Sequence, residues 1–255
     1  MTVGDIYNAI DAFAPFHTQE KWDNSGLLVG SMLNEARKVL VTLDISDAAF
    51  ARAQELGCDV IVSHHPVIFT PLKTLVDSPI VCNLVRYGMS AICCHTPLDL
   101  APGGLNDLLA DRLKAELPVA EIKPLLDDGL GRLLTLREPQ SEREIAAAAK
   151  RALGCQYVRY LPDHAESPYI EHLAVCTGSG SSLLEEIADT CECLLTGDVK
   201  HDRWYRAQEL SMGLIDCGHY STEVIMVPYA ARKLREALPG LEVIEFMEGE
   251  PAAYV

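Results

Sequence analysis

Histidine and carboxylate side chains gather in four short clusters, each directly after an apolar run typical of a buried strand. In chain order the clusters are His64 with His65, His95 with Asp99, Asp198 with His201, and His219 with Glu223. In open α/β sheets ligands bind beyond the carboxyl ends of the strands, so clusters placed this way can converge on one site. Imidazole and carboxylate ligands without thiolate suit Zn, Mn, Fe, Co or Ni. The pattern predicts a metal site for which three imidazoles and two carboxylates are the candidate ligands: His64, His65, Asp99, His219 and Glu223.

These five side chains are too few to saturate two metal ions, so positions stay open for water or substrate, as catalytic sites require. His64 and His65 are adjacent, and adjacent residues of a strand point to opposite faces. Pro66 keeps His65 extended, and the two rings can fan apart to serve two ions. The alternative is one buried and one exposed histidine at a strand end.

The other clusters also have structural explanations. His95 and Asp99 are separated by Pro97, which predicts a loop, and Asn106 is suited to N-cap a helix over residues 107–115. A carboxylate such as that of Glu223 is favoured by the dipole near the start of a helix.

Two glycine-containing stretches lie outside the strand-end clusters. Residues 22–30 read as an ordinary loop entering a strand. The Gly-Ser-Gly-Ser-Ser stretch at 178–182 precedes a helix and can bind phosphate there, although it lacks the Lys of a P-loop and a plain helix cap explains it as well.

The elements that must position these residues alternate between strands and helices, which indicates βα units and a largely parallel sheet. In the first half the expected strands are 39–43, 60–62 and 90–94, and the expected helices are 47–56 and 79–87. In the second half the expected strands are 173–176, 193–195 and 214–217, and the expected helices are 182–190 and 203–211. This repeated plan predicts two similar α/β lobes with mixed, largely parallel sheets and a metal site between them.

A stretch rich in Pro, Asp and Gly at residues 117–139 predicts the lobe boundary. We therefore expect a first lobe of residues 1–125 plus 225–255 and a second lobe of residues 126–224. Residues 227–238 are expected to form a helix that Pro228 delays or kinks, and residues 242–246 a strand that rejoins the first lobe.

Composition limits the function classes. The chain has 255 residues and a formal net charge of −16, which disfavours attraction to nucleic acid or to an anionic membrane surface. Bound cations can still make a local site for a phosphorylated small molecule. Nine cysteines, mostly inside apolar runs, indicate reduced thiols, and no apolar stretch approaches the ~20 residues of a membrane span. We expect a soluble cytoplasmic protein with no nucleic-acid partner and no membrane partner.

Taken together, the motifs resemble those of the NGG-interacting-factor-three-like family, also called GTP cyclohydrolase 1 type 2 homologues. The resemblance covers nearly the whole chain and rests on five motifs, which are Trp-Asp-Asn-Ser-Gly-Leu at 22–27, Ser-His-His-Pro at 63–66, His-Thr-Pro-Leu-Asp at 95–99, Thr-Gly-Asp at 196–198, and Gly-His-Tyr-Ser-Thr-Glu at 218–223.

The resemblance implies a two-lobed protomer, two divalent metal ions between the lobes and a toroidal homohexamer. The metal ligands it implies are His64, His65, Asp99, His219 and Glu223, with Glu223 bridging the ions. It makes His95 a neighbouring residue that supports a ligand or transfers protons. The roles of Asp198 and His201 stay open, because some members carry a histidine pair where this chain has His-Asp at 201–202.

The function that the resemblance implies is metal-dependent hydrolysis, by a metal-bound hydroxide, of a purine nucleotide or a related phosphorylated small molecule. The alternative is a non-catalytic metal-binding protein that acts in assembly or interaction. Neither the identity of the metal nor the substrate follows from the residues.

Overall fold

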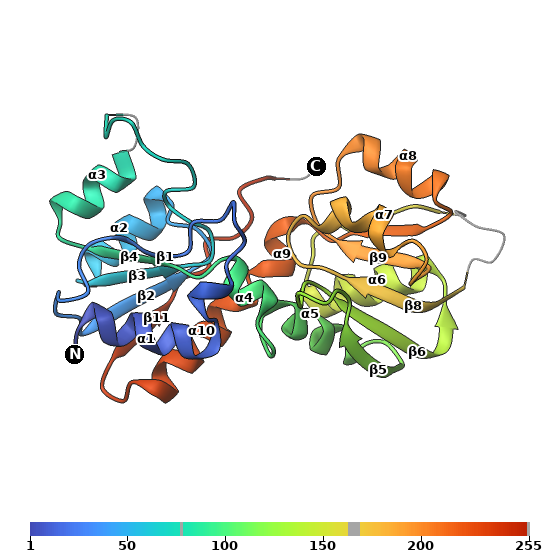
Figure 1. Ribbon diagram of the computed structural model, residues 1–255, viewed down its shortest axis with the longest axis horizontal. Coiled ribbons are helices and arrows are strands. Elements are labelled where there is room, and N and C mark those ends of the chain that lie inside the picture. The colour runs from blue at the N-terminus through green and yellow to red at the C-terminus, as the bar shows by residue number, and fades with distance from the viewer. Residues whose placement is uncertain (77–78, 163–168, 254–255) are drawn as a thin grey trace. The chain divides into compact units, whose positions relative to one another are not determined.

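The computed structural model describes residues 1–76, 79–162 and 169–253 (Figure 1). The chain forms two compact units. Unit 1 contains Met1–Ala101 and Met226–Gly249, and unit 2 contains Pro102–Ile225 and continues from Glu250. Each unit is built on one mixed sheet, which confirms the expected α/β class.

The sheet of unit 1 has the strand order β1-β4-β3-β2-β11. Its strands are β1 (Gly26–Val29), β2 (Lys38–Thr42), β3 (Val60–Ser63), β4 (Ser90–Cys93) and β11 (Glu242–Glu245). Strands β11, β2, β3 and β4 run parallel, and β1 is antiparallel to β4. The predicted return of the C-terminal strand to the first sheet is confirmed, since Val243 is in register with Val39.

Helices cover both faces of this sheet, with α1 and α10 on one side and α2 and α3 on the other (Figure 1). The helices of unit 1 are α1 (Val3–Phe13), α2 (Asp47–Glu55), α3 (Pro79–Arg86), α4 (Thr96–Leu100) and α10 (Met226–Ala237), with the 3-10 turn η1 (Phe16–Thr18). Strand β3 is buried along its whole length, as an apolar run covered on two faces must be.

The sheet of unit 2 has the order β5-β6-β8-β9-β10-β7. Its strands are β5 (Val119–Pro124), β6 (Arg132–Gln140), β7 (Arg159–Tyr160), β8 (Ile170–Val175), β9 (Cys193–Thr196) and β10 (Gly213–Asp216). Strands β8, β9 and β10 are parallel, and the other neighbours pair antiparallel. The helices are α5 (Leu105–Lys114), α6 (Glu142–Leu153), α7 (Leu184–Ile187), α8 (His201–Glu209) and α9 (His219–Glu223), with the 3-10 turn η2 (Gly180–Leu183).

Alternate residues of the parallel strands of unit 2 enter two different cores, because successive strand side chains point to opposite faces. Leu195 and Ile215 pack in the core with α5 and α6. Leu194 and Leu214 pack in the core with α7 and α8. The three parallel strands therefore end in the same direction between two helix layers, the arrangement expected from the sequence.

The segment at 117–139 differs from the expectation of a lobe boundary. It forms the antiparallel pair β5 and β6, with Glu121 opposite Thr135 and Pro124 opposite Arg132. Proline is tolerated here because β5 is an edge strand, where an N–H is not needed for the ladder. The change of unit lies at Ala101–Pro102, so α5 and β5 belong with unit 2 rather than with the first lobe.

Two prolines expected to prevent or delay helices lie inside first turns. Pro97 is in the first turn of α4, for which His95 is the N-cap, so the segment predicted as a loop is a short helix. Pro228 is the third residue of α10, which begins at Met226. The first helical N–H groups have no partner within the helix, so a missing N–H costs nothing there.

Two other local predictions were wrong. Asn106 is buried inside α5, whose N-cap is Gly104, and its Oδ1 accepts a hydrogen bond from the Thr177 N–H at 3.0 Å. Glu223 is the last residue of α9, so its position is not explained by a helix N-terminus.

In the part of the chain that the structure describes, no helix is both long and apolar enough to cross a membrane.

Candidate metal centre

Three histidines of unit 1 lie together at the carboxyl edge of its sheet. His64 and His65 follow β3, and His95 comes two residues after the end of β4, the parallel neighbour of β3. The ring centroid of His64 is 5.1 Å from those of both His65 and His95, and the latter two are 5.7 Å apart. One nitrogen of each ring lies within 4.8 Å of the others. The group can therefore hold a metal ion.

The orientation of His64 is set by the backbone. Its Nδ1 lies 2.9 Å from the Cys94 carbonyl oxygen, and because a carbonyl only accepts, Nδ1 carries the proton. The lone pair of the neutral ring is then on Nε2, which lies 3.7 Å from Asp99 Oδ1. His64 is fully buried and Asp99 is 9% exposed.

Carboxylates orient the other two rings in the same way. Nδ1 of His65 donates to Asp44 Oδ1 at 2.8 Å, and Nδ1 of His95 donates to Asp23 Oδ1 at 2.8 Å. A carboxylate partner on one ring nitrogen raises the basicity of the other nitrogen, as in carboxylate–histidine–metal arrangements. His64 is buried and His65 half-buried, and their ring planes are 47° apart.

Asp23 is held in the charged form. Burial alone would raise its pKa, but hydrogen bonds donated by His95, Thr96 and Ser25 outweigh burial and lower the pKa well below the usual range of an aspartate. A persistent carboxylate keeps the proton of His95 on Nδ1. The thiols of Cys93 and Cys94 have pKa values raised by burial, so neither offers a thiolate to this group.

Unit 2 carries a second group, built on the end of β10 and the short helix α9. Nδ1 of His219 donates to Asp198 Oδ2 at 2.8 Å, and its Nε2 lies 2.9 Å from Glu223 Oε2. Asp198 follows β9 and has the left-handed φ of +50°, which is uncommon for a residue other than glycine. Asp198 thus orients His219 as Asp44 orients His65.

Glycines allow the backbone to approach this second group. Gly178 has a φ of +64°, and a Cβ built on it would lie 2.2 Å from Glu223 Oε1. Its N–H donates to Thr222 Oγ1 at 3.0 Å, and the N–H of Gly180 donates to Thr196 Oγ1 at 2.7 Å. The glycine-containing loop is therefore explained by close packing against the Glu223 carboxylate, and two of its N–H groups are used within the fold.

The predicted site residues thus fall into two groups, each within one unit. Unit 1 brings together His64, His65, His95 and Asp99. Unit 2 brings together Asp198, His219 and Glu223. His201 is exposed at the start of α8, where its ring centroid is 5.2 Å from that of Tyr205.

Asp23 and Asp44 were missed as functional residues. Asp44 follows β2, so the strand-end rule that selected the histidines also applies to it. Asp23 lies in the stretch that reads as an ordinary loop, and only its bond across 72 residues to His95 reveals its role.

Comparison with known proteins agrees with these features. Residues 1–251 match the Duf34/NIF3 (NGG1p interacting factor 3) family. The chain belongs to the DUF34/NIF3 family. A GTP cyclohydrolase 1 type 2 homolog from Lactococcus lactis subsp. lactis is 34% identical over 260 residues, which cover 97% of either chain. NGG1-interacting factor 3 from Saccharomyces cerevisiae is 31% identical over 86% of this chain and 85% of its own. The structure of reduced HcgD from Methanocaldococcus jannaschii aligns with a TM-score of 0.84 at 28% identity, over 96% of this chain and 97% of that one.

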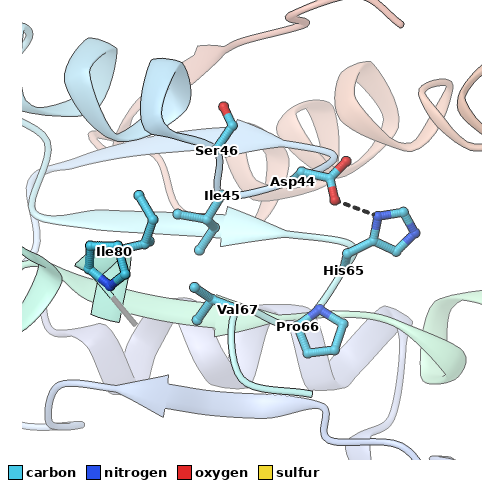
Figure 2. Close-up of a pocket in the computed structure, with 8 residues that line it drawn as sticks. Asp44, Ile45, Ser46, His65, Pro66, Val67 and Ile80 are labelled. Atoms are coloured by element: carbon cyan, nitrogen blue, oxygen red, sulfur yellow. Dashed lines mark hydrogen bonds and ion pairs between the residues drawn. The ribbon is translucent and has the colours of Figure 1, made fainter. Parts of the chain in front are cut away.

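In this DUF34/NIF3 chain a pocket of about 410 Å³ opens beside His65. Figure 2 shows Asp44 and His65 at one end, and Ile45, Val67 and Ile80 converging in the middle. Its size is within the roughly 300–1,000 Å³ of small-molecule sites. No Lys or Arg is among the described residues that line it, so the pocket suits an uncharged part of a ligand better than a phosphate.

The Asp44–His65 bond leads to a prediction for this DUF34/NIF3 member. We expect Asp44→Asn to weaken metal binding about 10- to 100-fold, as loss of an orienting carboxylate does, because the amide no longer fixes the proton on Nδ1. The measurement is a competition titration of the purified protein with a chromogenic chelator. Asp47→Asn is the control, because Asp47 is an exposed carboxylate three residues away at the start of α2. Equal affinities for the two variants would contradict the orienting role.

Proposed function

We propose that this chain is a metal-dependent hydrolase that holds two divalent metal ions and acts on a purine nucleotide or a related phosphorylated small molecule. The observation that carries the proposal is the shared orientation of four histidines, in each of which an oxygen acceptor holds Nδ1. The four are His64, His65, His95 and His219. The lone pairs of His64, His65 and His95 are then on Nε2, an orientation that metal-ligating histidines adopt. Nε2 of His219 lies 2.9 Å from Glu223 Oε2, the carboxylate proposed to share its metal.

We assign the two ions to three imidazoles and two carboxylates, with Glu223 as the bridge. The ligands in this proposal are His64, His65, Asp99, His219 and Glu223. It requires that unit 1 and unit 2 contribute to one centre. The residues fit such ions, because imidazole and carboxylate suit Zn, Mn, Fe, Co or Ni, and His64 and His65 already hold their Nδ1 protons away from the proposed site.

The chemistry divides between the ions and the protein. When bound, the ions supply Lewis acidity, which lowers the pKa of a coordinated water towards about 7 and stabilises developing negative charge. His95 can accept a proton at Nε2 and return it, since Asp23 holds its Nδ1. Asp44 and Asp198 hold the rings of His65 and His219 in place. In this scheme Asp198 orients a ligand, and His201 has no step of its own.

Two observations favour the substrate class. The relative from Lactococcus lactis carries the name GTP cyclohydrolase 1 type 2 homolog, which points to a purine nucleotide. The pocket beside His65 offers mainly apolar walls next to a proposed ligand, as a site for the uncharged part of a small molecule does.

The experiment that tests the function begins with metal analysis of protein purified without chelators, and we expect about two ions per chain. Nucleotides and phosphoesters are then screened with added Mn, Fe, Co, Ni or Zn. The expected result is turnover that a chelator removes and the metal restores. Turnover that survives chelation, or metal-loaded protein that hydrolyses nothing in the screen, would contradict the proposal.

A second candidate is favoured by the name of the yeast relative, NGG1-interacting factor 3. In that case the chain is a non-catalytic metal-binding protein of assembly or interaction, with full metal occupancy and no turnover in the same screen.

For both candidates we propose a toroidal homohexamer, which light scattering of the same preparation would show as six chains of 27.9 kDa. We also propose a cytoplasmic location, because all nine cysteines are free thiols and such thiols persist in reducing compartments.

A further inference from the structure

We infer that Trp22 and Phe69 form an aromatic platform that binds the planar ring of the substrate beside the histidines of unit 1. The inference rests on the proposed function and deepens it, because it names the residues that select a ring-bearing substrate.

Both side chains of the aromatic platform are exposed. Trp22 is 58% and Phe69 is 52% exposed, although tryptophan is highly buried on average in folded proteins. The other tryptophan of the chain, Trp204, packs against the core of unit 2. Contiguous exposed apolar surface is a feature of ligand-binding grooves, whereas single exposed apolar residues need no explanation.

The aromatic platform adjoins the histidine group. The ring centroids of Trp22 and Phe69 are 6.1 Å apart and the ring planes are tilted by 46°, so a planar ligand stacks on one ring and contacts the other at an angle. His95 lies nearly perpendicular to both rings, with centroid distances of 5.8 Å to Trp22 and 6.5 Å to Phe69. Because His95 is 5.1 Å from His64, a ring stacked on the aromatic platform places its substituents next to the proposed metal ligands.

The surrounding hydrogen bonds hold the aromatic platform in place. Asp23, next to Trp22, is bonded to His95 and to the N–H and hydroxyl of Thr96. Nδ2 of Asn24 donates to the carbonyl of Ile68 at 2.6 Å, which ties the segment of Trp22 to the segment of Phe69. The Trp-Asp-Asn stretch thus uses its two polar side chains to fix both loops and leaves its indole exposed.

The chemistry of the aromatic platform selects a planar π system. Stacking on Trp and Phe recognises any nucleobase, because every base has a π face. The Asp23 carboxylate, which is next to Trp22 in the chain and bonded to His95, repels phosphate. We therefore assign the purine ring, rather than the phosphate groups, to the aromatic platform.

Guanosine and ribose 5-phosphate are the probes, because the first has the ring without phosphate and the second has phosphate without the ring. Equilibrium dialysis with the full-length, metal-loaded protein gives the Kd of each. We expect Trp22→Leu to weaken guanosine binding roughly 5- to 150-fold, the range reported for loss of base stacking, and to leave ribose 5-phosphate binding unchanged. Trp22→Phe should restore most of the affinity.

Tyr87→Leu is the matched control, because Tyr87 is an exposed aromatic residue of unit 1 that packs on Phe50. In a Trp204→Phe background Trp22 is the sole tryptophan, and guanosine should quench its fluorescence. Unchanged guanosine affinity in Trp22→Leu would overturn the inference. The inference would also be overturned if Trp22→Leu changed the oligomeric mass measured by light scattering but not the affinity for guanosine. In that case the two rings would contact a second copy of the chain and not the substrate.

The experiments can refute the aromatic platform and the metal-dependent hydrolase independently of each other. Guanosine binding that depends on Trp22 in a protein without any turnover would support the aromatic platform and contradict the hydrolase. Metal-dependent turnover of a purine nucleotide with the same KM in Trp22→Leu would support the hydrolase and overturn the aromatic platform.

Discussion

Replacing His65 by alanine is expected to lower turnover by more than about 100-fold and to reduce the metal content of the purified protein. The variant removes a proposed ligand, so its effect should exceed the roughly 10- to 100-fold cost of losing an orienting partner. Elemental analysis and the rate with the best substrate of the screen are the two measurements. Because His65 is half-buried at the end of β3 and outside the main cores, the fold should survive the change.

His17→Ala is the matched control for this variant. His17 is an exposed histidine of unit 1 in η1, so its loss should leave both metal content and rate unchanged. Melting temperatures of the two variants, both measured after removal of metal with a chelator, should agree. A His65→Ala protein that keeps its metal and its rate would refute the assignment of His65 as a ligand.

Gly197→Ala is expected to have the largest effect on stability. A Cβ at this position would lie 2.6 Å from the carbonyl carbon of Gly218 and 2.7 Å from the carbonyl oxygen of Gly178. Both contacts are backbone atoms, which cannot rotate away, so the cost is that of overpacking, about 3 kcal/mol. For a chain of this length that corresponds to a loss of about 6–12 °C in Tm, measurable by calorimetry.

The same change should disturb the metal group of unit 2. The N–H of Gly197 donates to the Gly178 carbonyl at 2.9 Å, and the following residue is Asp198, which orients His219. Gly154→Ala is the control, since Gly154 has a φ of +67° with open space around it. Gly154→Ala introduces backbone strain without a steric clash and should lower the free energy of unfolding by only about 1 kcal/mol. Equal losses in the two variants would show that the close approach at Gly197 is unimportant.

The parallel strands and the residues that follow them could be predicted from the sequence. The run at residues 60–62, which begins β3, is apolar without interruption, which is typical of strands covered on both faces. Parallel strands end at one edge of a sheet, so the sequence could place the histidine clusters at that edge, and the pairing of β3 with β4 then puts His64 beside His95. To predict these histidine clusters at the strand ends, only the local apolar pattern and the geometry of parallel sheets were needed.

The partners of the histidines could not be predicted in the same way. The pairing of His65 with Asp44 requires that β2 lie next to β3, and that of His95 with Asp23 spans 72 residues. Such choices depend on tertiary packing and not on spacing. The strands β5 and β6 were missed because prolines and an Asp-Asp-Gly turn resemble a linker, although an edge hairpin accommodates both.

The return of β11 to β2 affects how the chain can fold during synthesis. Unit 1 is discontinuous, since residues 102–225 separate its two parts, and β11 is made after the described strands of unit 2. Until β11 emerges, the backbone of β2 offers an unpaired edge, which is a template for pairing with other chains. All the strands of unit 2 are complete before that point, so unit 2 can fold first on the ribosome. A nascent chain that stalls after unit 2 would expose the aggregation-prone edge of β2. Pairing of β11 with β2 removes this exposed edge once α10 and β11 have been made.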